Sequence, residues 1–351
     1  MNSARSGLEN KGIDELYRRN QIKSICFLII LSGVLIAAIL LSLLAGSYET
    51  PLGELVRGIF GCAADRKINI VVRSNRMPRI ITAVLAGGGL GLAGCILQAV
   101  LRNPLASSST LGVSQGATFG AAFAIVVLGL EASDGFGIPL CAFLGSVAVA
   151  AVILGLSRFR QISPEGIVLA GVAISSMFTG ATTLIQYFAD EVQLSTLVFW
   201  TFGDLGSTGW DDLGGMAAMV AIVCGYCWMH RWDYNALLSG EETAISLGIH
   251  VKRLTLVNMF ICCLCSSVVV SCVGLISFIG LAAPHIVRMV VGNNHVYLIP
   301  GSILGGAVLL LLSDLFARTA ISPVILPIGA ITSFLGGPLF VYLLFKGGEK
   351  A

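Results

Sequence analysis

Three short motifs in this sequence contain residue types that could do chemistry. Gly89-Leu-Gly91-Leu-Ala-Gly94 has the glycine spacing of dinucleotide-binding loops, and Gly112-Val-Ser114-Gln-Gly116 has that of the nucleophile turn of serine hydrolases. Cys224 and Cys227 have the two-residue gap of redox and zinc-binding pairs. Each motif carries chemistry only if its surroundings supply the other groups that the chemistry requires.

The surroundings of all three motifs favour helix packing instead. The glycine motif lies inside a long apolar run, with no preceding strand and no acidic residue about 20 positions later. A hydrolase at Ser114 needs a histidine base on a facing helix, whereas the four histidines lie near the ends of apolar runs or in loops. Nothing polar surrounds the cysteine pair, which is typical of small buried apolar side chains. No Gly-x4-Gly-Lys-Ser/Thr motif occurs, so we expect no catalytic residue, no cofactor and no metal site.

The composition indicates that lipid is the solvent of this chain. Only 11% of its 351 residues are charged, whereas 56% are hydrophobic. A charged side chain at a bilayer centre costs roughly 2.5–3.5 kcal/mol, and a spanning helix needs about 20 apolar residues. We therefore predict an all-α, polytopic membrane protein with about ten transmembrane helices. The apolar runs are 22–45, 78–100, 111–130, 137–157, 164–188, 210–230, 253–273, 275–291, 297–316 and 324–345.

Basic residues predict the orientation of the chain in the membrane. Cytoplasmic loops are enriched in Lys and Arg, and with ten spans most of the 21 basic residues lie on the side of the N-terminus. We expect a plasma or inner membrane protein with both termini in the cytoplasm: a segment 1–21, a single membrane domain 22–346 and a tail 347–351. The first outer loop, 47–75, is unexpectedly basic, and its role and that of residues 1–21 stay open.

The inner loop 231–252 contains the signals of a short helix at 239–248. Ser239 and Glu242 have the spacing of a capping box, and Gly248 is a natural stop. The helix has an apolar side of Ala244, Ile245 and Leu247 and an acidic start of Glu241 and Glu242. It could lie on the membrane surface, but the inner leaflet is negative and attracts basic helices. An acidic helix is better suited to a socket on a partner protein.

Arginines mark the opposite side of the membrane. Arg76 and Arg79 are three residues apart at the start of the second run, on one helical face, and Arg318 precedes the last run. Such arginines often only extend to the membrane interface. Alternatively they contact an acidic partner outside the cell, where each exposed pair would contribute about 0–1 kcal/mol.

The second run ends at Arg102-Asn103-Pro104-Leu105-Ala106, which is followed by Ser107-Ser-Ser-Thr110. This composition predicts non-helical backbone close to the inner surface. Such backbone is tolerated at membrane depth only inside protein or beside a water-filled path, so the segment is a gate candidate. The run from Gly274 to Pro284 is broken in a similar way.

These motifs occur in the order found in one family, and the chain resembles the permeases of FecCD-type ABC importers, which take up iron–siderophores, haem and cobalamin. The likeness extends from about residue 76 to 346, and residues 1–70 match only as a generic first helix. The matching segments are Arg76-Met-Pro-Arg79, Gln98, Arg102-Asn-Pro-Leu-Ala106, Leu111-Gly-Val-Ser-Gln-Gly-Ala117, Leu169-Ala-Gly-Val172, Gly240-Glu241 to Leu247-Gly248, Phe278-Ile-Gly-Leu281, Pro284-His-Ile-Val-Arg288, Asp314, Ala317-Arg318, Leu326-Pro-Ile-Gly329 and Gly337-Pro338.

The resemblance implies an assembly in which this chain is not itself an enzyme. A homodimer, or a heterodimer with a sister permease, would join two cytoplasmic ATPase subunits and an extracytoplasmic substrate-binding protein. ATP would be hydrolysed on the ATPase subunits. An iron–siderophore is the leading substrate because it is the most frequent in the family, with cobalamin and haem as alternatives.

The resemblance also implies roles for individual residues. Arg76, Arg79 and Arg318 match arginines that meet acidic residues of the binding protein. Asn103 and Leu105 match a gate loop, and a second gate piece falls at Pro164 and Glu165, where cobalamin-importing members have small hydroxyl residues. This departure leaves the substrate open. The coupling segment that seats in the ATPase matches Gly240, Glu241, Glu242, Ala244, Leu247 and Gly248.

Two other classes of function remain as alternatives. An ion-coupled secondary transporter needs an ion-binding residue inside a span, and Asp314 is the best candidate, although its position near the outer end also suits a structural role. An intramembrane serine protease would use Ser114. Either protein would act without an ATPase partner.

Overall fold

The computed structural model describes residues 2–46, 48, 50–131, 134–159, 163–322 and 324–348, so residues 349–351 of the predicted tail lie outside the described residues. Within these ranges the chain forms helices and no β-strand. The helices are α1 (Asn2–Leu44), α2 (Leu52–Ile59), α3 (Arg66–Ile70), η1 (Val71–Arg76), α4 (Met77–Val100), α5 (Val113–Ala122), η2 (Phe123–Val127), α6 (Gly137–Phe159), α7 (Pro164–Tyr187), α8 (Glu191–Phe202), α9 (Trp210–Met229), α10 (Arg231–Leu238), α11 (Glu241–Ser246), α12 (Val251–Val273), α13 (Ile279–Val291), α14 (His295–Thr319) and α15 (Ile328–Gly348).

The helices confirm the predicted fold class and most of the predicted spans. Among the described residues, seven helical segments are long and apolar enough to cross a bilayer, and Val113–Val127 and Ile279–Val291 are shorter apolar helices. The 21-residue α15 coincides with the last predicted run. The second span is longer than predicted, because α3 and η1 extend α4 into one helical segment, Arg66–Val100.

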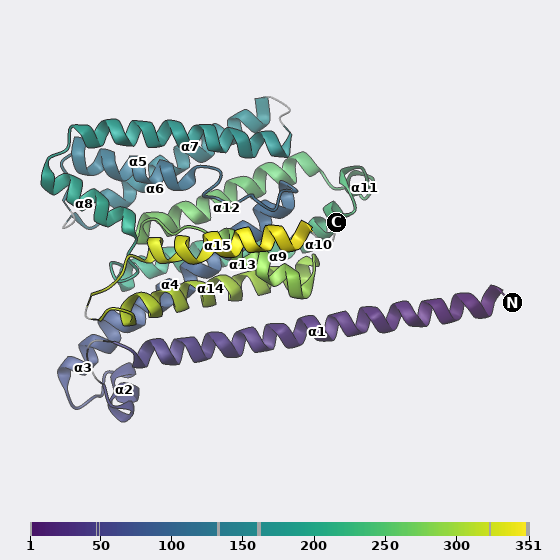
Figure 1. Cartoon of the computed structure of the whole chain (residues 1–351), viewed down its shortest axis with the longest axis horizontal. Coiled ribbons are helices and arrows are strands. Elements are labelled where there is room, and N and C mark those ends of the chain that lie inside the picture. The colour runs from purple at the N-terminus through teal and green to yellow at the C-terminus, as the bar shows by residue number, and fades with distance from the viewer. Residues whose placement is uncertain are drawn as a thin grey trace.

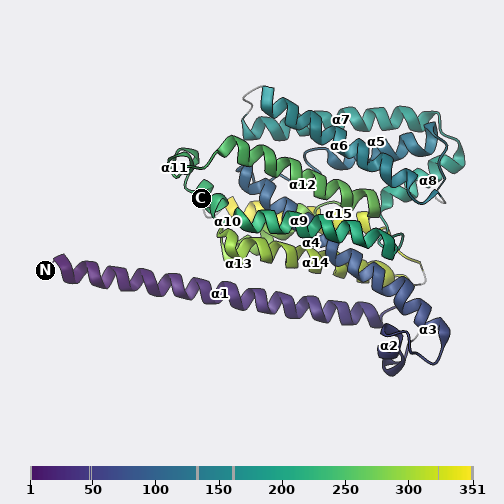
Figure 2. The same cartoon turned by 180° about the vertical axis from the view of Figure 1, so that it is seen from behind.

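The helices form a bundle with two distinct ends (Figures 1 and 2). One end carries α10 and α11 and is called the α11 end; the other carries α2, α3 and α8 and is called the α8 end. Helix α1 begins, and α15 finishes, on the side of the α11 end (Figure 1). An even number of crossings, as in the ten predicted spans, requires this arrangement.

Helix α4 lies at the centre of the bundle, where its glycines permit close helix contacts. A Cβ atom at Gly87 would overlap the backbone of Gly306 in α14, and one at Gly94 would overlap the carbonyl of Gly280 in α13. Gly91 similarly faces the carbonyl of Ser302. In lipid, helices associate through such close van der Waals packing. The glycine motif with the spacing of a dinucleotide-binding loop is therefore confirmed as a packing surface.

The outward faces of the bundle are apolar, as contact with lipid tails requires. Ile29 and Ile30 on α1 and Leu184 on α7 are among the many exposed large hydrophobic residues. The polar segment before the first span is also helical, and it continues α1 away from the bundle (Figure 1).

The backbone unwinds between α12 and α13, where Gly274 and Phe278 have positive φ angles of 75° and 66°, confirming the predicted break. Helix α8 was not predicted, because it lies between the predicted spans 164–188 and 210–230 and is too short to span a membrane. Its signal was present, since Asp190 and Gln193 form a capping box with both reciprocal hydrogen bonds.

Candidate functional site

The loop between α4 and α5 leaves the helical conformation at Arg102, whose φ of 48° is positive. The side-chain oxygen of Asn103 accepts a hydrogen bond from the Leu105 N–H (2.9 Å), which stabilises a local turn. The Thr110 hydroxyl accepts from the Ser107 N–H (2.9 Å), so polar side chains satisfy backbone groups that a helix would otherwise satisfy. The predicted irregular segment is confirmed, and Leu105 is partly exposed within it.

This loop packs directly against α7. A Cβ atom at Gly171 would collide with the carbonyl of Thr110, so only glycine permits the contact. Helix α7 begins at Pro164, after the N-cap Ser163, whose hydroxyl accepts from the Gly166 N–H (3.2 Å). Glu165 is exposed in the first turn. The two predicted gate segments therefore belong to neighbouring elements.

The N-cap of the short helix α11 is one residue later than predicted, and the predicted capping box is wrong. Its N-cap is Gly240, with a φ of 106°, and no side chain caps it. Ser239 instead ends α10, because its N–H donates to the carbonyl of Ala236 (3.1 Å). The stop at Gly248 is confirmed by its φ of 86° and by the hydrogen bond from the Ile249 N–H to the Ala244 carbonyl (3.0 Å).

Helix α11 leaves apolar side chains uncovered. Ala244 is fully buried, whereas Ile245 and Leu247 are 57% and 66% exposed. Glu242 is exposed beside them. We call Glu242, Ile245 and Leu247 the α11 surface.

An ion pair connects α11 to the loop after α4. Arg102 Nη2 lies 2.8 Å from Glu241 Oε2, and both side chains are about 40% exposed. Arg102, Ser163 and Glu241 line one cavity of about 420 Å³, which brings together the loop, the start of α7 and α11. Sequence reasoning missed this pair, since opposite charges 139 residues apart carry no local signal.

At the α8 end, Asp314 of α14 is fully buried between two arginines. Its Oδ1 accepts from Arg79 Nε and its Oδ2 from Arg318 Nε, both at 2.9 Å. Arg79 also lies 3.5 Å from the exposed carboxylate of Asp204. A carboxylate held by two guanidinium groups is not free to bind a coupling ion, so the geometry supports the structural role of Asp314 and counts against the secondary-transporter alternative.

Arginines also satisfy the carbonyl groups at the end of α1. Arg76, itself buried, donates to the carbonyls of Leu43 (2.7 Å) and Tyr48 (2.6 Å). Arg318 donates to the carbonyl of Ala45 (3.1 Å) and the hydroxyl of Ser42 (2.5 Å). The last four carbonyls of a helix lack intrahelical partners, and cations are favourable there.

The three arginines thus all have partners within the chain, which favours a structural role for their guanidinium groups. Their contact with carboxylates of a binding protein stays a prediction.

Nearby, the Tyr48 hydroxyl donates to Asp65 Oδ2 (3.1 Å), and this hydrogen bond together with the negative charge of Asp65 raises the pKa of Tyr48.

The remaining chemistry-like motifs are packing features. Ser114 is buried on α5, and in the described structure His230, His250 and His295 are not hydrogen-bonded to it. Gly116, two residues later, faces the carbonyl of Gly145 on α6. Cys227 is fully buried in the apolar core. His230, His250 and His295 therefore do not supply the base that the protease alternative requires.

Known proteins share both the sequence and the fold of this chain. It is 46% identical over 343 residues to MJ0087 of Methanocaldococcus jannaschii, named as an ABC transporter permease protein, covering 95% of this chain and 98% of that protein. A solved structure described as an inward-facing ABC transporter of the metal-chelate type matches with a TM-score of 0.80 and 30% identity, covering 91% and 98% of the two chains.

Two further relatives have names that state a cargo. The hemin transport permease HmuU of Yersinia pestis is 34% identical, covering 78% of this chain and 83% of its own. The vitamin B12 import permease BtuC of Escherichia coli is 35% identical, covering 95% and 99%. Residues 34–346 match the sequence profile of one family. The loop after α4, α11 and all helices from α2 to α14 lie within this match, and the chain belongs to the FecCD transport family.

Proposed function

We propose that this permease carries a metal chelate inward, with an iron–siderophore as the leading cargo and ATP hydrolysed on partner subunits. The α11 surface is the observation that carries this proposal. It exposes two apolar side chains beside an acidic one at an end of the bundle, and an ion pair ties the same helix to the gate loop. Apolar residues exposed at such a helix are typical of a protein interface.

The proposed assembly places the α11 end in the cytoplasm. One ATPase subunit would contact the α11 surface of each permease, and a second copy of this chain would complete the pore, with a sister permease as the alternative. The segment from Gly240 to Gly248 would act as the coupling helix. Its acidic first turn favours a basic socket on the ATPase.

The gate would be formed by Asn103 and Leu105 on one side and by Pro164 and Glu165 on the other. When the ATPase dimer closes, it would displace α11, and the Arg102–Glu241 pair would transmit the movement to the loop. The loop backbone is held by side-chain hydrogen bonds and not by a helix, so it can change conformation without unwinding α4.

A substrate-binding protein would dock at the α8 end, outside the cell. Arg76, Arg79 and Arg318 would hold this end in shape through their internal partners and face the docked protein at their exposed edges. The exposed positive charge of the α8 end is carried by Arg57, which pairs with Glu54, and by Arg66, Lys67 and Arg73. Such charges steer and orient an acidic partner more than they hold it.

The choice of cargo rests on what the relatives share. Hemin and vitamin B12, the cargoes named for two relatives, are both metals held in a large organic ligand, and the structural neighbour is of the metal-chelate type. A ferric siderophore has the same chemistry and leads on its frequency in the family. Cobalamin and haem are the alternatives.

The first test is ATP-driven uptake of a labelled ferric siderophore into vesicles. We expect uptake only when the chain is reconstituted with its ATPase and binding protein, and not with the chain alone. Reversing Glu241 and Glu242 to lysine should abolish uptake, because the α11 surface would repel a basic socket. Glu15→Lys, an exposed reversal on α1, is the control and should leave uptake intact. Undiminished uptake by the double variant would exclude the coupling role.

A second test concerns the Arg102–Glu241 pair. Arg102→Glu and Glu241→Arg should each reduce the ratio of chelate transported to ATP hydrolysed by up to about fivefold, since an exposed pair contributes about 0–1 kcal/mol. The double swap should restore most of this ratio, because the pair is rebuilt with opposite polarity. If the double swap is as impaired as the single variants, the pair does not connect α11 to the gate.

A further inference from the structure

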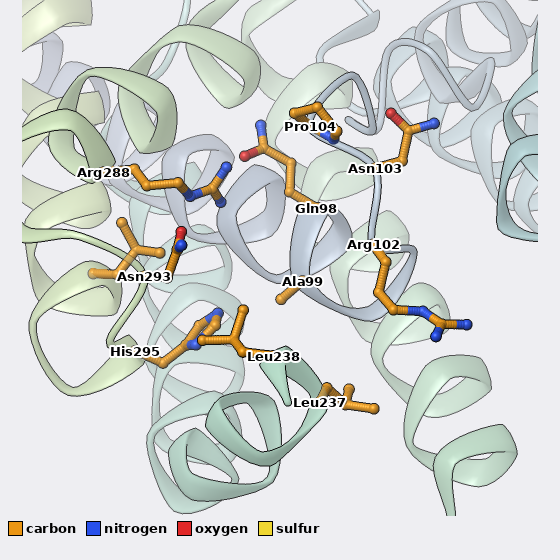
Figure 3. Close-up of a pocket in the computed structure, with 11 residues that line it drawn as sticks. Gln98, Ala99, Arg102, Asn103, Pro104, Leu237, Leu238, Arg288, Asn293 and His295 are labelled. Atoms are coloured by element: carbon orange, nitrogen blue, oxygen red, sulfur yellow. The ribbon is translucent and has the colours of Figure 1, made fainter. Parts of the chain in front are cut away.

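A second cavity at the α11 end is lined by polar groups that lack partners. It has a volume of about 310 Å³ and lies between α4, α10, α13 and α14 (Figure 3). Its polar lining includes Gln98, Arg288, Asn293 and His295, and the loop residues Asn103 and Pro104 form one wall. None of the roles proposed above uses Gln98, Arg288, Asn293 or His295.

His295, which lines this cavity, has an unsatisfied hydrogen-bond acceptor. Its backbone N–H and its ring Nδ1 both lie within hydrogen-bond distance of Asn235 Oδ1, at 2.8 and 3.0 Å. A backbone N–H can only donate, so the Asn235 atom is the oxygen and Nδ1 carries the ring proton. Nε2 of the neutral ring is therefore an acceptor, and it is buried without a partner, in a residue only 1% exposed.

Gln98 supplies a second unsatisfied acceptor. Its Nε2 donates weakly to the carbonyl of Leu281 (3.5 Å), which orients the amide. Its Oε1 then faces Arg288 (Figure 3) and has no hydrogen-bond partner, although the residue is only 3% exposed. A buried acceptor without a hydrogen bond is destabilising, so both atoms favour a donor from a bound group.

Arg288 supplies a positive charge without a counter-ion. Its guanidinium extends towards Gln98 (Figure 3), and among the described residues no carboxylate lies within ion-pair distance. Its place in the last turn of α13 is favourable for a cation, but the helix dipole offsets only part of the cost of half-burying the charge. Arg102 does not share this role, because Glu241 holds it and it points away (Figure 3).

We propose that this cavity binds a protonated phosphate-type oxyanion, supplied either by inorganic phosphate or by the headgroup of a phosphomonoester lipid. Arg288 requires a negative oxygen, whereas Gln98 Oε1 and His295 Nε2 require an O–H donor. A phosphate that keeps one proton offers both, whereas chloride and sulfate carry no O–H at neutral pH. Water would satisfy the acceptors but not the charge. A bound anion would also brace the loop at Asn103 and Pro104.

The test measures anion binding and needs neither ATPase nor cargo, so it stands or falls separately from the transport proposal. The full chain in phosphatidylcholine nanodiscs should bind radiolabelled inorganic phosphate at one saturable site. Sulfate should compete at least about tenfold more weakly, because it lacks the donated hydrogen bonds. The measurement is then repeated in nanodiscs that contain phosphatidic acid. If the lipid displaces radiolabelled phosphate, its headgroup is the natural ligand. If phosphate binding is unchanged, free phosphate is the natural ligand.

Two variants and a control separate the site from non-specific attraction. Arg288→Gln should weaken phosphate binding at least about tenfold, and Gln98→Leu should narrow the preference for phosphate over sulfate while sulfate binding persists. Arg253→Gln, an exposed basic residue that lines other cavities at the same end, should bind phosphate as the unaltered chain does. Absence of saturable binding in both kinds of nanodisc, or binding and preference unchanged in both variants, would overturn the proposal.

Discussion

Replacing Asp314 with alanine should lower the free energy of unfolding by about 3–5 kcal/mol, because the change leaves two arginines buried without their shared carboxylate. Arg79 would retain only the longer contact to Asp204 (3.5 Å). Arg318 would retain bonds to uncharged oxygens of Ser42 and Ala45. Denaturant unfolding in mild detergent, followed by circular dichroism, measures this effect.

The matched control is Asp211→Ala at the same end of the bundle. Asp211 is exposed in the first turn of α9, where its charge gains only a helix-dipole interaction of about 0.3–1 kcal/mol. The Asp314 variant should therefore lose several times more stability than the Asp211 variant. Equal losses in the two variants would show that the buried triad does not hold the α8 end together.

Replacing Gly94 with valine should destabilise the bundle by about 3 kcal/mol or more, the upper range for overpacking a core. A Cβ atom at this position would overlap the carbonyl and Cα of Gly280, and backbone atoms cannot move aside as a flexible side chain can. Helices α4 and α13 would have to separate, which also removes contacts with α14. The midpoint of thermal unfolding and the yield of folded protein in detergent measure the effect.

Gly215→Val on α9 is the matched control for this substitution. A Cβ atom at Gly215 meets no heavy atom within 4 Å, so the added side chain enters open space. Valine is a slightly better helix former than glycine, and the stability should change by no more than about 0.5 kcal/mol. Tolerance of valine at both positions would mean that α4 does not pack as closely as its glycines indicate.

The ends and breaks of helices were predicted correctly where a single local signal was present. The broken segment after α4 was readable from Asn103 and Pro104, and the end of α11 from Gly248, because turn-forming and αL-compatible residues act locally. Where two local signals competed, prediction failed. Serine is a common residue type at the start of a helix. The N–H of Ser239, however, is hydrogen-bonded at the end of α10, and Gly240 is the N-cap of α11.

The candidate site was predicted in parts but not as an arrangement. The sequence identified the gate loop, the start of α7 and the coupling segment as separate stretches. It did not reveal that Arg102 contacts Glu241 or that Arg79 and Arg318 share Asp314. These two arginines were therefore expected to contact a partner protein, whereas in the structure they bind groups of the same chain.

The sequence by itself determined that this is a helical membrane protein and approximately where its helices lie. This was possible because lipid offers no hydrogen bonds, so each spanning segment must satisfy its own backbone and carry its own apolar residues. Only the tertiary structure decided which charged groups are paired, which apolar side chains of α11 stay exposed and which polar atoms lack partners. Those properties depend on contacts between residues as far apart as Arg79 and Asp314, 235 positions along the chain, and no local pattern encodes such a contact.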